Sequence, residues 1–253
     1  LSEMGVYNLG FKIANVLKIV VIQSAFSAIN PLRFKMMDKP DNKRFYSKIM
    51  TYSVFGFFIV QMVLMYFSKE LIVLIAEDQN YWGAIHIIPI LCFVQLFEIL
   101  RRNVNIGLAI QKKTKIISFA MLTSALVNIG LNFILIYLFG AIGAAVATLV
   151  SQILFFGIIY YNAQKHYYVP YEMVKIAKMT GLVIILTIIA YLSNNIELIP
   201  RLIIKVFLIT GFPFLLYLMK FYEPIEIQRI SQAWQKWKNP AHWRDNIRQI
   251  KIK

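Results

Sequence analysis

Apolar residues form seven long runs along the chain, and polar residues gather between them. The runs are residues 5–29, 49–67, 85–107, 116–138, 141–162, 177–193 and 201–219. Most of them have the roughly 20 residues that a helix needs to cross a hydrocarbon core of about 30 Å. We therefore predict an all-α, polytopic membrane protein with seven transmembrane helices in residues 1–219.

The clearest predicted element is a hairpin of two helices joined by Phe139 and Gly140. Small residues occupy the turn and the helix after it, namely Gly140, Gly143, Ala144, Ala145 and Ala147. Such residues allow two helix backbones to approach closely in lipid. Lysines precede the first helix and follow the second, at Lys112, Lys113, Lys115 and Lys165. This pattern predicts a transmembrane hairpin whose two free ends lie on the cytoplasmic side.

Basic residues are concentrated in alternate connections between the runs. Segments 31–48, 109–115, 163–178 and 220–253 carry 20 of the 27 Lys and Arg residues, whereas segments 1–4, 68–84, 139–140 and 194–200 carry only Lys69. Because cytoplasmic loops are enriched in Lys and Arg, we expect Leu1 outside the cell and Lys253 in the cytoplasm.

The segment after residue 219 differs from the rest of the chain. Residues 220–253 are basic and carry Ile227, Ile230, Trp234 and Trp237 at helical spacing. We predict a second region here, an amphipathic helix lying on the cytoplasmic leaflet. A solvated tail that binds anionic lipid electrostatically is the alternative.

Composition agrees with a membrane protein and excludes several other classes. Hydrophobic residues make up 59% of the 253 residues, charged residues 15%, and the mean hydropathy is +0.62. A soluble domain has about 25% charged residues. The net charge of +15 would suggest nucleic acid as a partner, but the charges lie between apolar runs, so we expect none. The single cysteine, Cys92, lies inside a run and is expected to fill the core.

Motifs of catalysis and cofactor binding are absent from the sequence. GVYNLGFK resembles a phosphate-binding loop, but Phe11 stands where the lysine is required and no strand precedes it. There is no G-x-S-x-G motif and no cluster of cysteine and histidine. We therefore predict no enzyme activity, no catalytic residue, no cofactor and no metal site.

Polar residues lie along one face of the first run. Asn8, Lys12, Asn15, Gln23 and Asn30 fall within an arc of about 80° at 100° per residue, and Lys18 lies about 60° beyond it. Polar groups in a membrane span are costly, so they face a cavity or a partner. This stripe either lines a water-filled lumen or serves helix packing, with the lysines extending to the interface.

The third and fourth runs add further polar residues. Glu98 and Arg102 are four residues apart and are predicted to pair, which leaves Arg101 with charge to spare. Both arginines are either interfacial anchors or ligand contacts. Asn128 and Asn132 either bond a neighbouring helix or line a cavity. A cavity lined by these side chains would be cationic and would suit a phosphate or pyrophosphate.

Several segments resemble a known family. They are KKTK at 112–115, VNIGLN at 127–132, LFGAIGAAVATL at 138–149, YYVPYE at 167–172 and EMGVYNLGFKIANVL at Glu3–Leu17. They resemble oligosaccharide-lipid flippases of polysaccharide biosynthesis, in the superfamily of the multidrug and toxin extrusion (MATE) antiporters. The resemblance implies a MATE-like fold of fourteen helices, of which this chain supplies the last seven, in a bacterial inner membrane.

The resemblance also implies a function and roles for the polar residues. The substrate would be an undecaprenyl-pyrophosphate-linked oligosaccharide, which is moved to the outer leaflet for O-antigen, capsule or exopolysaccharide assembly. Lys12, Lys18, Arg101 and Arg102 would bind the pyrophosphate, and Asn15, Gln23, Asn128 and Asn132 would bind the sugars, with Glu98 beside them. Expected partners are membrane lipids and the missing first lobe, or another membrane protein of polysaccharide assembly. An ion-coupled antiporter of small molecules and a non-transporting scaffold of a glycan synthesis complex are the alternatives.

Overall fold

The computed structural model describes residues 2–76, 78–228 and 231–232. The chain divides into two compact units, Leu1–Ile209 and Thr210–Lys253, and each is considered by itself. The described residues form helices and turns and contain no strand. The protein is therefore all-α, as the sequence predicts.

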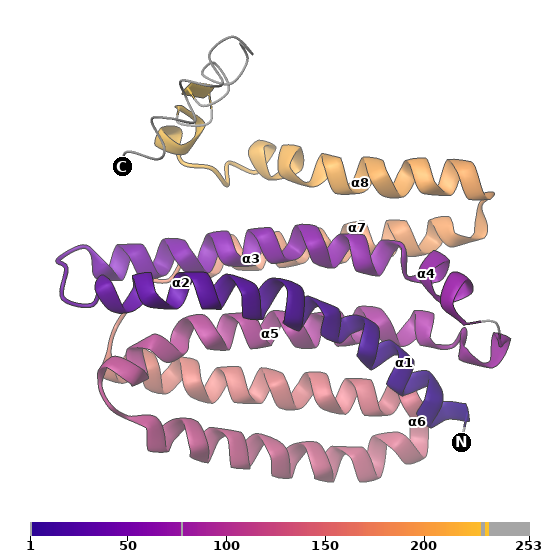
Figure 1. The fold of residues 1–253 in the computed structure, drawn as a ribbon, viewed down its shortest axis with the longest axis horizontal. Helices are drawn as coiled ribbons and strands as arrows, with labels where there is room; N and C mark the ends of the chain where they lie inside the picture. Colours follow the sequence, from indigo (N-terminus) through magenta and orange to yellow (C-terminus); the bar gives the residue numbers. More distant parts are fainter. Residues whose placement is uncertain (1, 77, 229–230, 233–253) are drawn as a thin grey trace. The chain divides into compact units, whose positions relative to one another are not determined.

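The first unit begins with one long helical segment of three parts. These are α1 (Ser2–Val16), the π-helix η1 (Leu17–Gln23) and α2 (Ser24–Lys35). The later elements are α3 (Asn42–Tyr66), α4 (Ser68–Ile75), the short η2 (Gln79–Tyr81), α5 (Ala84–Ile110), α6 (Thr114–His166), α7 (Met173–Leu192), η3 (Ser193–Asn195) and α8 (Leu198–Leu218) (Figure 1). The boundary between the two units falls within α8.

Six helical segments among the described residues are long and apolar enough to cross a membrane. They are Glu3–Lys35, Asn42–Tyr66, Gln79–Ile110, Thr114–His166, Met173–Asn195 and Leu198–Leu218. All seven runs identified in the sequence lie inside these segments, to within one residue at their ends, and two of the runs share α6. The chain thus has the helices of a membrane protein.

The helix α6 consists of two limbs that reverse direction at Gly140. The backbone of Gly140 is non-helical, with φ +55°, a conformation that L-residues with side chains rarely adopt. The two limbs lie against each other. The hydroxyl of Ser124 on the first limb donates to the carbonyl oxygen of Ser151 on the second limb at 2.7 Å. The hairpin predicted at Phe139 and Gly140 is confirmed.

The helix α5 is the centre of the first unit. It packs against α1, α3 and α6, and it is the most buried of the candidate spans. Its apolar side chains, including Ile88, Leu91 and Ile99, are almost completely buried. Cys92 is fully buried among them, as expected for a core residue. Polar residues on α5 are therefore held at fixed positions within the bundle.

The connections of the first unit meet at two ends. At the first, called the basic end, Tyr46, Ile106 and Val169 form a buried apolar cluster. They come from α3, α5 and the connection between α6 and α7. These residues lie in or next to segments 31–48, 109–115 and 163–178. The sequence analysis placed these segments on one side of the membrane, since they are rich in lysine and arginine.

The remaining connections meet at the opposite end. Here the Lys69 ammonium donates to the carbonyl oxygen of Asn194 at 2.7 Å, and Glu70 pairs with Arg201 at 2.8 Å. A Cβ atom on Gly5 would lie 2.8 Å from the ring of Tyr81, so the start of α1 also lies at this end. The start of α1 and the connections at 68–84 and 194–200, which the charge pattern placed on one side, therefore meet at this end. Segment 220–253 belongs to the second unit, so its place on the basic side stays a prediction.

The described part of the second unit contains the last turns of α8 and a short helix at residues 224–228. The Tyr222 hydroxyl donates to the carbonyl oxygen of Pro213 at 3.4 Å. Of the residues that predicted an amphipathic tail helix, Ile227 lies in this short helix. Ile230, Trp234 and Trp237 lie outside the described residues, so the tail helix stays a prediction.

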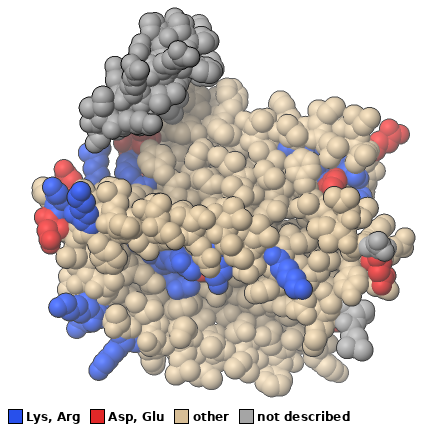
Figure 2. All heavy atoms as spheres, in the orientation of Figure 1, with Lys and Arg blue, Asp and Glu red and all other residues tan. Residues whose placement is uncertain are grey.

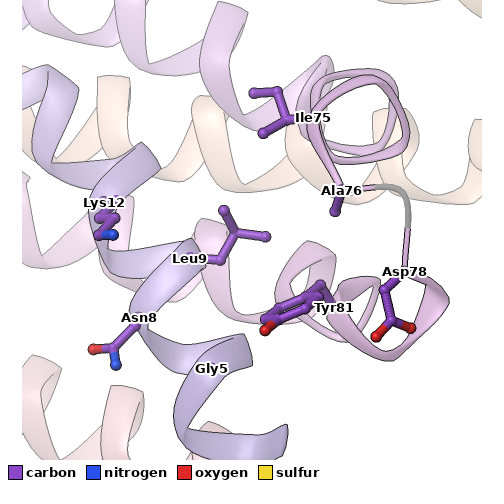
Figure 3. Close-up of a pocket in the computed structure, with 8 residues that line it drawn as sticks. All are labelled: Gly5, Asn8, Leu9, Lys12, Ile75, Ala76, Asp78 and Tyr81. Atoms are coloured by element: carbon purple, nitrogen blue, oxygen red, sulfur yellow. The ribbon is translucent and has the colours of Figure 1, made fainter.

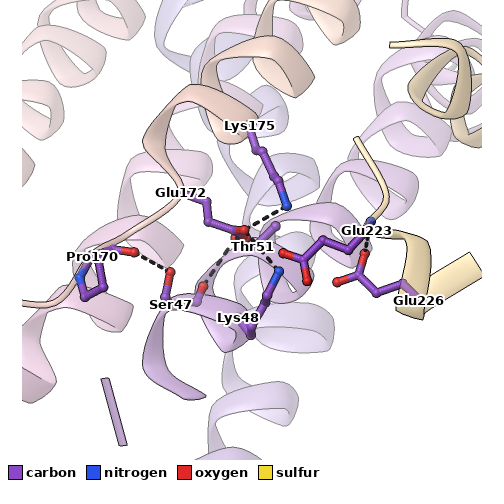
Figure 4. Close-up of polar contacts among 8 residues, drawn as sticks. All are labelled: Ser47, Lys48, Thr51, Pro170, Glu172, Lys175, Glu223 and Glu226. Atoms are coloured by element: carbon purple, nitrogen blue, oxygen red, sulfur yellow. Dashed lines mark hydrogen bonds and ion pairs between the residues drawn. The ribbon is translucent and has the colours of Figure 1, made fainter. Parts of the chain in front are cut away.

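Glu172 connects α3 to the start of α7 at the basic end (Figure 4). Its carboxylate accepts hydrogen bonds from Lys48 at 3.0 Å, Thr51 at 2.7 Å and Lys175 at 2.7 Å. Burial alone would raise the pKa of Glu172, but these three donors outweigh it and lower the pKa below its usual value of 4.5.

We predict that replacing Gly143 by alanine destabilises the α6 hairpin. A Cβ atom at this position would overlap the carbonyl oxygen of Leu135 on the other limb, and that backbone cannot move aside cheaply. We expect a loss of about 1–3 kcal/mol, measured as a lower midpoint of thermal unfolding in detergent. Gly157 is the matched control, because a Cβ atom there has no neighbour within 4 Å. An equal loss in Gly157→Ala would contradict close packing of the limbs at Gly143.

We predict that Glu172 makes stability depend on acid. Because its pKa is lowered in the folded state, its contribution is complete above about pH 4.5 and is lost as the pH falls through the folded pKa. Thermal unfolding of the wild type should therefore shift downward between pH 6 and pH 3.5 by more than that of Glu172→Gln. Parallel shifts in the two proteins would show that Glu172 contributes nothing to the acid sensitivity.

Candidate functional site

Lys18, Glu98 and Arg102 form an ion cluster between η1 and α5. Arg102 donates to one oxygen of Glu98 through Nε at 3.1 Å and through Nη2 at 2.9 Å. The ammonium of Lys18 lies 3.5 Å from the other oxygen. The predicted pairing of Glu98 with Arg102 is confirmed, and the structure adds Lys18. Two cations face one carboxylate, so the cluster keeps an excess of positive charge.

Arg101 points to a different neighbour from that of Arg102. Its guanidinium carbon lies 4.3 Å from the centre of the Phe155 ring, on the second limb of α6. Its Nε atom is buried without a hydrogen-bond partner among the described residues. Adjacent residues on a helix point in different directions, which explains why only one of the two arginines reaches Glu98. The structure does not bring Arg101 into the ion cluster.

Arg33 is a buried cation that is not among the predicted site residues. Only 3% of its surface is exposed, and it donates to the carbonyl oxygen of Asn103 at 2.6 Å and to that of Arg102 at 3.3 Å. It also donates to the side chain of Asn30 at 3.3 Å. The sequence placed Arg33 in a cytoplasmic connection, but α2 continues through Pro31 to Lys35. The spacing of Asn30 and Arg33, three residues apart, was the available signal.

Lys12 lies apart from the ion cluster, in an open pocket of about 550 Å³. Lys12 and Asn8 lie on the α1 side of this pocket, and Ala76 and Asp78 lie across it, on the connection after α4 (Figure 3). Lys12 is exposed, and no ion pair of its ammonium is found among the described residues. Its positive charge is therefore available to a ligand.

The polar stripe of the first helix is interrupted by η1. The prediction assumed α-helical geometry from Asn8 to Asn30, and that assumption is wrong, because Leu17–Gln23 is a π-helix. A π-helix takes more residues per turn, so residues after it are rotated relative to those before it. Asn15 precedes the π-helix and is half-buried, whereas Gln23 ends it and is exposed.

Basic side chains nevertheless lie in a row across the middle of the visible face (Figure 2). Lys12 is exposed, as are Val16, Ile19 and Val20 of the same helical segment, and the side chain of Lys18 is 37% exposed. An exposed ammonium on a membrane-spanning helix contacts the lipid, water or ligand that lies beside that helix.

Asn128 and Asn132 belong to a hydrogen-bond ladder within α6. Asn132 donates to the Asn128 side chain at 3.1 Å, and Asn128 donates to the Ser151 hydroxyl at 3.0 Å. Both asparagines also line a pocket of about 390 Å³ between α1 and α6, beside Tyr7 and Thr148. The sequence left helix bonding and cavity lining as alternatives, and Asn128 does both. The side-chain oxygen of Asn132 has no donor among the described residues.

Six of the nine predicted site residues thus fall into three groups, at Lys18 with Glu98 and Arg102, at Lys12, and at the two asparagines Asn128 and Asn132. Asn15, Gln23 and Arg101 belong to none of these groups. The first two groups offer positive charge to an anion, and the third offers amide groups to hydroxyls. Within the described residues, no group of three His, Cys, Asp or Glu side chains could hold a metal ion. The chain matches no protein-family model, no curated protein and no solved structure.

Proposed function

We propose that this protein moves a lipid-linked oligosaccharide with a pyrophosphate head from the cytoplasmic to the outer leaflet of a bacterial inner membrane. The observation that carries the proposal is the pair of ammonium groups on one membrane-spanning helical segment, with Lys12 exposed and the Lys18 side chain 37% exposed. A charge in this position is costly unless it faces water or a polar ligand. A phosphate-bearing head group that crosses the bilayer is such a ligand.

The ion cluster suggests how the head group would be held. Arg102 is bound to Glu98 by two short hydrogen bonds, whereas the Lys18 ammonium lies farther away, at 3.5 Å, and its side chain is 37% exposed. Lys18 can therefore exchange Glu98 for a phosphate oxygen more easily than Arg102 can. Charge-assisted hydrogen bonds from Lys18 and Lys12 would hold the head, and the amides of Asn128 and Asn132 would contact sugar hydroxyls.

The membrane arrangement follows from the charge pattern and from the break at Gly140. We propose seven crossings, with α6 crossing twice, Leu1 on the outer side and the basic tail in the cytoplasm. The exposed side of the first helical segment, which carries Lys12, would then face a lumen. A first lobe of similar helices would close this lumen from the other side, and rocking of the two lobes would expose it alternately to the two leaflets.

The two cations beside Glu98 argue against the antiporter alternative. A carrier of a cation or proton needs a carboxylate that is available in the membrane, whereas Glu98 is compensated by both Lys18 and Arg102. Its side chain is 11% exposed, so the pairing also shields it from solvent. This arrangement favours an anionic ligand over a cationic one.

We predict that neutralising Lys12 and Lys18 together strongly reduces export of surface glycan. The chain is expressed, alone and with a matching first lobe, in a bacterial strain that lacks its own oligosaccharide-lipid flippase. Loss of two charged hydrogen bonds should reduce export roughly tenfold or more in Lys12→Gln/Lys18→Gln. Lys112→Gln/Lys115→Gln is the control, since it removes the same charge at the basic end.

Either of two results would count against this proposal. Full export by the Lys12→Gln/Lys18→Gln protein would exclude these lysines as ligands. Absence of export by the wild-type chain in both forms, with membrane insertion confirmed, would exclude the flippase itself and favour a scaffold.

We predict that Glu98→Gln retains export in the same strain when export is normalised to the amount of protein in the membrane. The amide still accepts a hydrogen bond from Arg102, and Lys18 becomes free for the anionic head group. An antiporter that uses Glu98 as its cation-binding acid would lose transport in this variant. Complete loss of export at normal abundance would show instead that transport needs the Glu98 carboxylate, which contradicts its role as a counter-ion only.

A further inference from the structure

A third pocket lies at the opposite end of the first unit from the basic end, away from the ion cluster. Its volume is about 230 Å³, and its lining includes Lys69, His86, Tyr191, Leu192, Asn194 and Asn195. These residues belong to the start of α4, the start of α5, the end of α7 and the η3 turn that follows it. All of them lie close to the end of a candidate span, so the pocket lies at the level of a membrane interface.

The polar side chains of this pocket can donate hydrogen bonds. The Lys69 ammonium donates to the carbonyl oxygen of Asn194 at 2.7 Å, which fixes its position and leaves two further N–H groups. The Tyr191 hydroxyl lies 2.8 Å from Nδ1 of His86. When the hydroxyl donates to Nδ1, a neutral imidazole carries its proton on Nε2, which can donate to a ligand. Asn195 adds an exposed amide.

The nearby carboxylate does not neutralise this positive charge. Glu70 follows Lys69 in α4, but its oxygens are already bound by Arg201 at 2.8 Å and by Lys205 at 2.8 Å. Arg201 also donates to the carbonyl oxygen of Asn194, at 3.3 Å. No carboxylate is among the residues that line the pocket in the described part of the chain. The pocket therefore combines donors with uncompensated positive charge.

We propose that this pocket binds a phosphate group at the membrane interface. Phosphate oxygens accept several charge-assisted hydrogen bonds, and lysine is a common phosphate ligand. The apolar side chains of Ile85 and Leu192 also line the pocket, next to the polar ones, as suits the head group of a phospholipid. Inorganic phosphate would accept the same hydrogen bonds. A phospholipid differs from it in having an apolar part, which Ile85 and Leu192 can contact. The site does not depend on the proposed transport.

The test uses the purified full chain in a non-ionic detergent. Two probes are titrated separately: inorganic phosphate, and dihexanoyl phosphatidylglycerol below its micellar concentration. A ligand that binds the folded state raises the midpoint of thermal unfolding with concentration, which gives its affinity. We expect Lys69→Gln and His86→Gln each to weaken binding, roughly tenfold for Lys69→Gln. Lys115→Gln, which removes the same charge at the basic end, should leave it unchanged.

The outcomes distinguish a phospholipid from inorganic phosphate as the ligand. They also distinguish a specific site from general attraction of an anion to a basic protein. Binding of the lipid alone assigns the pocket to a phospholipid head group, and binding of both probes assigns it to the phosphate group itself. The proposal is overturned if neither probe binds, or if Lys69→Gln and His86→Gln both bind as the wild type does. An equal loss in Lys115→Gln would also overturn it. Because His86 is exposed, His86→Gln keeps the test valid if Lys69→Gln fails to fold.

Discussion

Compensation of polar groups on the central helix α5 is the interaction on which the rest of the first unit depends. In an apolar bundle a buried charge or carbonyl group without a partner costs several kcal/mol. Glu98 is satisfied from η1 by Lys18, and Asn103 donates to the Ser53 hydroxyl of α3 at 3.0 Å. Arg33 of α2 donates to backbone carbonyl groups of α5. The same contacts that remove these costs therefore fix where the first helical segment and α3 lie.

The α6 hairpin is held by a different means. Its two limbs meet through small residues and hydroxyl groups, with Gly143 against the backbone at Leu135 and Ser124 bonded to Ser151. Close backbone approach gives van der Waals contact that apolar side chains alone do not provide in lipid. The Asn128 amide takes part in this contact, because it donates to Ser151 and accepts from Asn132. The side-chain oxygen of Asn132, whose residue lines the pocket beside α1, has no donor among the described residues. The hairpin contact therefore engages the Asn128 amide and leaves an acceptor on Asn132.

The sequence predicted the features that depend on local pattern. Apolar length located the spans, and the reversal at Gly140 followed from two spans with no room for a longer connection. The pairing of Glu98 with Arg102 followed from helical spacing alone. Lys18 and Glu98 are 80 positions apart in the chain, so helical spacing could not predict that they pair. The π-helix at Leu17–Gln23 was also missed, because a continuous α-helix was assumed.

The basic groups of the first unit differ in how firmly they are held, and this difference bears on what each can do. Arg33 is buried and bonded to carbonyl oxygens, so moving it would leave several polar atoms without partners. Lys18 has one long contact and a side chain that is 37% exposed, and Lys12 is exposed in an open pocket. A cation moves to a ligand only if the free energy gained by binding the ligand exceeds the free energy lost with the contacts that the cation leaves. The lysines meet this condition, whereas Arg33 is better suited to keep α2 against α5 while the lysines exchange partners.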